Sequence, residues 1–103
     1  MSVTYLIVFD VKPERRAEFH RLLSGVLDAM RNETTFREAI LHRDPQSENR
    51  FMLYETWESH DDVMTNQINR PYREAWHAAL PELLNGPREI SVWEPMRADR
   101  QQG

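Results

Sequence analysis

The sequence predicts an α+β fold, a ferredoxin-like βαββαβ sheet with two helical regions on one face. Short segments rich in β-branched and aromatic residues alternate with segments of helical periodicity in that order. The first and third strand segments are the most apolar, which suits the two central strands of such a sheet. A length of 103 residues suits one domain. We expect that domain at residues 1–96 and a polar tail at 97–103.

The first half of the chain contains an apolar strand, an amphipathic helix and a more polar strand. Val3–Val11 has the composition of a strand. Pro13 suits the first position of a helix that we expect to end near Asn32. The second strand is expected at Phe36–Asp44, before a turn that ends at Asn49. One apolar stripe runs along the helix at helical spacing: Phe19, Leu22, Leu23, Val26, Leu27 and Met30.

The third strand and a short helix follow the turn. Phe51–Glu58, which is rich in apolar and aromatic residues, is expected as the third strand. Ser59 is followed three residues later by an acid, which is close to a capping box. A short helix is therefore expected from Ser59 to about Asn66.

The last helix and strand have clear start and stop signals. Pro71 begins a helix with an apolar side, and Pro81 is expected to kink or split it. The sequence Asn85-Gly86-Pro87 predicts its end. Arg88–Glu94 alternates and predicts the fourth strand.

The first strand also predicts how the domain assembles. Its alternate residues form two apolar sets, and the helices can cover only one of them. We expect a second copy of the chain to cover the other face, giving a homodimer packed sheet to sheet. The alternative is that the tail folds over this face. The two sets are Tyr5, Ile7, Phe9 and Val11 on one face, and Leu6 and Val8 on the other.

Composition excludes several classes of function. Thirteen Lys and Arg against seventeen Asp and Glu leave a net charge of −4 without a basic stripe, so nucleic acid is not expected as a partner. The longest uncharged apolar run, Tyr5–Phe9, is too short to cross a membrane. The N-terminal residues lack a basic signal region, so a cytoplasmic location is expected. The absence of cysteine excludes disulfides and thiolate metal sites, and no two histidines have ligand spacing, so no metal site is expected.

Two residues are candidates for proton transfer. Glu55 shares a strand face with Leu53 and Trp57, where an unpaired carboxylate is costly. It either lines a pocket with a raised pKa or pairs with an arginine. His42 lies near the end of the second strand, on the side assigned to Phe36, and is the best-placed histidine for a general base. The alternative for His42 is an exposed position on an edge strand.

The sequence resembles the antibiotic biosynthesis monooxygenase (ABM) superfamily of dimeric α/β barrels over about residues 3–95. The strand with Glu55-x-Trp57 is similar to an apolar Glu-x-Trp strand of that family. Further similarities are Lys12-Pro13, Glu18-Phe19, Arg31-Asn32-Glu33, Pro71-Tyr72, and Leu83-Leu84 before Pro87. The sequence departs from the family where members often have histidines, at Asn66 and at Pro71 or Tyr72. It has Glu33-Thr34-Thr35-Phe36 at the family's Glu-Pro-Gly-Cys step.

This resemblance implies a monooxygenase that acts on a small aromatic or quinol-like substrate with O2 and needs no flavin, haem or metal. The candidate substrate-binding residues are then Trp57, Asn66, Tyr72 and Trp76. Trp57 would wall a flat pocket, and Asn66 and Tyr72 would donate to a substrate oxygen. The alternatives are core packing for Trp57 and Tyr72 and plain capping for Asn66.

Relatives in the superfamily have other activities, so the fold alone does not determine the reaction. A non-catalytic small-molecule-binding or stress-response module is the main alternative to a monooxygenase. A haem-degrading protein and an isomerase are weaker alternatives.

Overall fold

The computed structural model describes residues 2–102, in which four strands form one antiparallel sheet of order β2-β3-β1-β4. The predicted order of elements is confirmed, and the apolar strands β1 and β3 are central as expected. Residues 1 and 103 of the expected domain and tail lie outside the described part. The elements are β1 (Val3–Asp10), α1 (Arg16–Met30), β2 (Phe36–Arg43), β3 (Arg50–Trp57), α2 (His60–Thr65), α3 (Glu74–Leu83) and β4 (Glu89–Trp93), with 3-10 turns η1 (Pro13–Arg15), η2 (Gln67–Asn69) and η3 (Pro71–Arg73).

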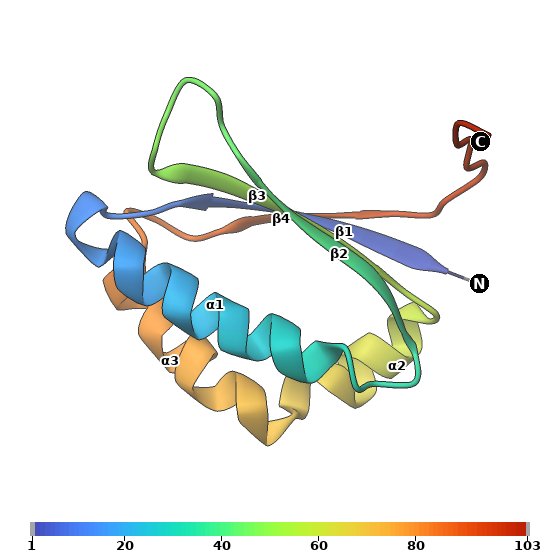
Figure 1. Ribbon diagram of the computed structural model, residues 1–103. Coiled ribbons are helices and arrows are strands. Elements are labelled where there is room, and N and C mark those ends of the chain that lie inside the picture. The colour runs from blue at the N-terminus through green and yellow to red at the C-terminus, as the bar shows by residue number, and fades with distance from the viewer. Residues whose placement is uncertain (1, 103) are drawn as a thin grey trace.

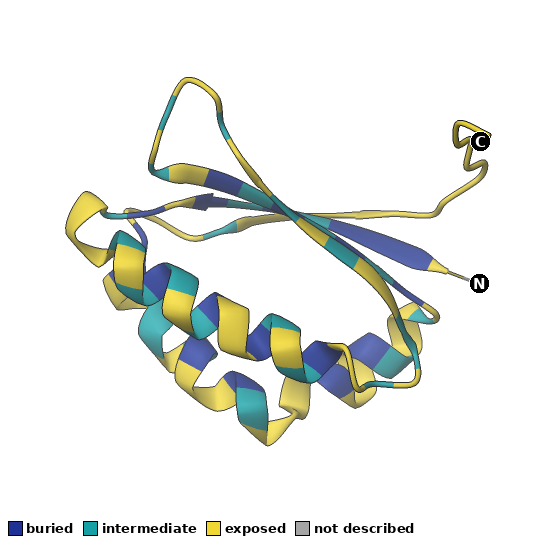
Figure 2. Cartoon of the chain, in the orientation of Figure 1, coloured by how far each residue is buried: buried dark blue, intermediate teal, exposed yellow. Residues whose placement is uncertain are grey.

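The three α-helices lie on one face of the sheet, and Figure 1 shows the opposite face free of helices. The pairing of β1 with β3 sets Tyr5 opposite Glu55 and Ile7 opposite Leu53, so these four side chains share the face toward the helices. Buried and partly buried residues alternate along β3 in the same way (Figure 2). This inner face and the helices enclose the hydrophobic core.

The apolar stripe of α1 packs into this core as expected. Phe19, Leu23, Val26 and Met30 are buried, and Leu22 and Leu27 are partly buried against them. The Phe19 ring lies 5.1 Å from Phe9 and 5.7 Å from Trp76, so β1, α1 and α3 meet in one aromatic cluster.

A bulge in β2 changes which face its side chains occupy. Phe36 pairs with Trp57 on the inner face, but the register shifts between Phe36 and Glu38. One extra residue in a strand moves all following side chains to the other face. His42 therefore pairs with Met52 on the outer face and is exposed. Its assignment to the face of Phe36 was wrong, because simple alternation ignores the bulge.

Pro81 does not split the last helix, so one of the two effects expected of it is wrong. Helix α3 runs without a break from Glu74 to Leu83 and contains Pro81. The proline lies in the last turn, where it removes one backbone donor. The amide of Leu84 still closes the turn by donating to the carbonyl of Leu80 at 3.1 Å. The helix therefore ends near the predicted stop signal.

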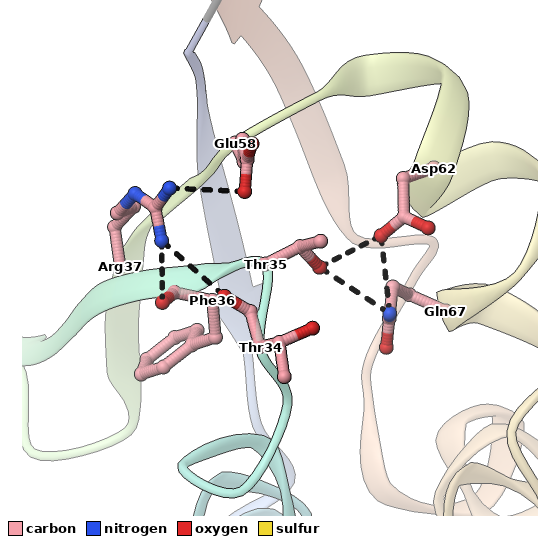
Figure 3. A network of polar contacts seen from close by, with 7 residues as sticks. All are labelled: Thr34, Thr35, Phe36, Arg37, Glu58, Asp62 and Gln67. Carbon is pink, nitrogen blue, oxygen red and sulfur yellow. Dashed lines mark hydrogen bonds and ion pairs between the residues drawn. The ribbon is translucent and has the colours of Figure 1, made fainter.

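The helix α2 is tied to the start of β2 by a small polar network, shown in Figure 3. Ser59 caps α2 as predicted, since its hydroxyl accepts a hydrogen bond from the amide of Asp62. The hydroxyl of Thr35 donates to Asp62 at 2.7 Å, and the amide of Gln67 donates to the same carboxylate at 3.1 Å. These hydrogen bonds, with one from Asn66, hold the pKa of Asp62 below its ordinary value. The network holds α2 against the sheet end.

The outer face of the sheet stays open within the described chain. Leu6 and Val8 are only partly buried there. Residues 94–102 are exposed and leave the end of the sheet rather than crossing it (Figure 1). The tail therefore does not cover this face. None of the helices described is long and apolar enough to cross a membrane.

Candidate functional site

A cavity of about 570 Å³ lies between the inner face of the sheet and the helices. Strands β1 and β3 form one wall, and α1 and α3 form the other. The lining is mostly apolar, which suits a small organic molecule. Its apolar residues include Ile7, Phe9, Leu23, Val26, Leu53 and Trp76.

The carboxyl group of Glu55 is a polar group in this apolar wall. The alternation of β3 directs it inward beside Leu53, and the residue is only 6% exposed. Burial raises the pKa of Glu55. A hydrogen bond from Trp57 and the charges of Arg73 and Arg88 act in the opposite direction, but burial is the largest effect. A buried carboxyl group with a raised pKa is suited to proton transfer.

Trp57 lies behind the cavity wall and positions Glu55. Its indole Nε1 donates to Oε1 of Glu55 at 3.1 Å. The ring is fully buried, with Phe36 edge-on at 5.2 Å and the guanidinium carbon of Arg73 5.7 Å from its centre. Trp57 thus orients the carboxyl group without lining the cavity.

Two arginines bring positive charge to the cavity. Arg73, at the end of η3, is only 8% exposed, and its Nε and Nη2 have no hydrogen-bond partner among residues 2–102. Arg88, just before β4, is half-buried, and burial lowers its pKa. Burial, Arg88 and Arg73 together lower the pKa of His77 in the same lining. The cavity is therefore a cationic environment around one carboxyl group.

A tyrosine and a histidine connect the cavity with the surface. The hydroxyl of Tyr5 and Nδ1 of His60 share a hydrogen bond of 2.7 Å. Tyr5 lines the cavity and is buried, whereas His60 is exposed. Burial, and secondarily the charge of Glu55, raises the pKa of Tyr5. The pair gives a direct polar contact between the wall and solvent.

The structure brings some of the predicted site residues together and separates others. Glu55 and Trp76 line the cavity, and Trp57 supports Glu55. Tyr72 is partly buried and donates to Glu33 at 3.5 Å, and its ring lies beneath Arg73. Asn66 is exposed and donates to Asp62 at 2.9 Å, outside the cavity lining.

Five polar residues of the cavity were missed by the sequence reasoning: Tyr5, Asn69, Arg73, His77 and Arg88. The alternation of the first strand placed Tyr5 on one face with Ile7 and Phe9, and the structure sets it opposite Glu55. The arginines carried no such signal, since the chain has many and their burial depends on packing. Within residues 2–102, no three His, Cys, Asp or Glu side chains lie close enough to hold a metal ion together.

The sequence of residues 2–79 matches the family described as antibiotic biosynthesis monooxygenase, ABM. The chain belongs to the ABM family. Membership confirms the resemblance suggested by the Glu55-x-Trp57 strand and the order of elements.

Relatives of this ABM chain agree in sequence and in fold. A protein of Pestalotiopsis microspora named "Putative monooxygenase GME11364" is 33% identical over 98 residues, which cover 92% of this chain and 80% of that protein. The solved structure of Rv0793 from Mycobacterium tuberculosis has a TM-score of 0.86 at 21% identity and covers 97% of this chain and 100% of its own. SnoaB, a cofactor-independent oxygenase from Streptomyces nogalater, has a TM-score of 0.80 at 20% identity, covering 94% and 95%. The two structures show that the ABM fold is shared.

Proposed function

We propose that this chain is a monooxygenase that oxidises a small aromatic or quinol-like molecule with O2 and without a cofactor. Membership of the ABM family and the monooxygenase relative support a monooxygenase-type function. The substrate class and the independence from cofactors are our extension, supported by SnoaB, a fold neighbour described as a cofactor-independent oxygenase.

The observation that carries the proposal is the Glu55 carboxyl group in the wall of an apolar cavity. No ion pair within 4.0 Å joins it to an arginine of the described chain. Glu55 therefore forms no direct ion pair within residues 2–102, and Arg73 and Arg88 act on its charge from a longer distance. A buried carboxyl group with a raised pKa suits the role of general base.

The reaction then needs little from the protein. Glu55 accepts the proton of a ring hydroxyl, and the electron-rich phenolate passes an electron to O2. The resulting superoxide and substrate radical combine and form a carbon–oxygen bond. The peroxide anion then takes the proton back from Glu55 and becomes a hydroperoxide. If the reacting carbon is a methylene group, loss of water leaves a carbonyl: one oxygen atom stays in the product and the other leaves as water. The substrate supplies all four electrons, and the cavity excludes bulk water and holds the anion.

A second copy of the chain completes the proposed enzyme. The outer face of the sheet presents the partly buried Leu6 and Val8 with nothing from the described chain over them. A homodimer packed through this face removes that apolar surface from water. Each cavity lies on the opposite side of its own sheet, so each protomer keeps one site.

Oxygen uptake with a panel of quinols and anthrones tests the proposal. We expect uptake above the enzyme-free rate, with formation of the oxidised product, and a loss of about 10²-fold in Glu55→Gln. Glu82→Gln is the matched control, because Glu82 is an exposed carboxylate on α3 and should leave the rate unchanged. Saturable binding of these compounds without oxygen uptake would instead identify a binding module.

A further inference from the structure

We propose that the natural ligand of the cavity carries a carboxylate, which binds to the Nε–Nη2 edge of Arg73 with Arg88 nearby. This inference deepens the proposed function, because it adds a charged group to the substrate of the same cavity. It makes that substrate an aromatic or quinol-like carboxylic acid.

Arg73 is a buried guanidinium with two nitrogens that have no partner in the described chain. A buried guanidinium normally forms an ion pair or several hydrogen bonds, since an uncompensated buried charge is strongly destabilising. Arg73 is 8% exposed, and two of its nitrogens are buried without a partner within residues 2–102. The rings of Trp57 and Tyr72 lie 5.7 and 5.5 Å from its guanidinium carbon, and the Tyr72 hydroxyl also has a polar interaction with it. A ligand that supplies the missing acceptors would satisfy it.

The two unpartnered nitrogens of Arg73 are Nε and Nη2. Nε and Nη2 lie on one edge of the planar guanidinium, so their N–H groups are parallel. Both atoms are closed off from solvent in this structure, so a ligand reaches them only when this edge turns toward the cavity. A carboxylate presents two oxygens at the matching spacing and accepts both in a bidentate pair. A single phenolate oxygen can satisfy only one of these donors well. The free edge therefore favours a carboxylate over a simple phenol.

The charged side chains of the cavity lining leave it with excess positive charge. Arg73 and Arg88 are both in the cavity lining, and Glu55 is the one carboxylate among the lining residues described. If Glu55 is ionised, one positive charge is left over, and if it is protonated, two are left over. In both states the cavity is complementary to an anion. Burial is the main cause that lowers the pKa of the neighbouring His77, and the charges of Arg88 and Arg73 lower it further.

The remaining lining defines the rest of the ligand. Leu23, Val26, Leu53 and Trp76 form apolar walls within about 570 Å³, which is the size range of pockets for small organic molecules. A second apolar hollow of about 580 Å³ adjoins the cavity and shares His77 and Arg88 with it. An aromatic body with one carboxylate fits both features.

Calorimetric titration of the intact protein with 2-naphthoate and 2-naphthamide tests the inference. The two probes have the same ring system and nearly the same shape, but only the first is charged. We expect 2-naphthoate to bind at least about tenfold more tightly, as charge-assisted hydrogen bonds predict. Equal affinity, or no binding of 2-naphthoate, overturns the inference without reference to any variant. Tighter binding of 2-naphthyl phosphate than of 2-naphthoate overturns the assignment to a carboxylate.

Variants locate the anion site. Arg73→Met should abolish the preference for 2-naphthoate, and Arg73→Lys, which keeps the charge but not the two-pronged edge, should restore only part of it. Arg31→Met is the matched control, because Arg31 forms a surface ion pair with Asp28, and it should keep the full preference. Arg73→Met should also melt no lower than the wild type, since it removes an unpartnered charge. A preference that survives Arg73→Met overturns the assignment.

The outcomes separate this inference from the proposed function. Oxygen uptake with neutral quinols but no preference for 2-naphthoate leaves the oxygenase and removes the carboxylate. A clear preference for 2-naphthoate, without oxygen uptake from any quinol or hydroxylated aromatic acid, supports the anion site and removes the oxygenase.

Discussion

The indole nitrogen of Trp57 donates a 3.1 Å hydrogen bond to the carboxyl group of Glu55, two residues earlier on the same strand. Both side chains point to the inner face because strand residues two apart share a face. The hydrogen bond favours the charged form of Glu55 and lowers its pKa, while burial raises it more strongly. Trp57 thereby orients the proposed base and lowers its proton affinity, against the larger effect of burial.

Replacing the base should separate catalysis from stability. Glu55→Gln keeps the shape and can still accept from Trp57, but it cannot take a proton. We expect turnover to fall about 10²-fold or more, with a melting temperature at or above that of the wild type. Turnover and melting measured on one sample check this. A destabilised variant with normal turnover per folded molecule would remove Glu55 from the site.

Replacing the positioning residue should shift the pH profile. Trp57→Phe removes the donor that lowers the pKa of Glu55. The acidic limb of turnover, which reports ionisation of the base, should therefore move to higher pH. We also expect a stability loss of about 1–2 kcal/mol from the smaller buried ring. Trp93→Phe is the matched control, since Trp93 is 57% exposed, and an unmoved limb in Trp57→Phe would contradict the role.

The stability of the fold should decline with pH because of Glu55. Its pKa is raised above the ordinary 4.5, so the folded protein binds a proton that the unfolded chain releases. The resulting stability is fully present below the ordinary pKa and is lost as the pH rises through the raised value. Urea denaturation across this range should show the decline in the wild type and a weaker one in Glu55→Gln. Parallel curves for the two proteins would contradict it.

The protein should be a homodimer at micromolar concentration. Light scattering should report about twice the 12.3 kDa of one chain. Val8→Asp, which places a charge on the outer face of β1, should shift the mass toward one chain, while Asp28→Asn on the exposed side of α1 should not. A single-chain mass for the wild type throughout this range would remove the proposed assembly.

Turnover should survive exhaustive chelation and need no added flavin or haem. This follows from the lack of cysteine and of ligand-spaced histidines in the sequence. Oxygen uptake before and after dialysis against a chelator checks it. Activity that is lost on chelation and restored by one metal would overturn the cofactor-free proposal.

The sequence alone determined the fold and named two residues of the cavity wall, Glu55 and Trp76. Alternation in β3, the apolar stripe of α1 and the cap at Ser59 are local patterns, and local patterns report strand, helix and helix start directly. The inward position of Glu55 followed from the same alternation, because its apolar neighbours define the buried face. The apolar β1 and β3 also indicated which strands are central.

Only the tertiary structure decided what surrounds Glu55. The bulge after Phe36 moved His42 to the outer face, and bulges depend on pairing between strands rather than on local composition. Arg73 and Arg88 lie far from Glu55 in the chain, and only the packing of η3 and β4 against the sheet brings their charges to its cavity. The sequence contains twelve arginines and does not reveal which two line the cavity, because burial depends on long-range contacts.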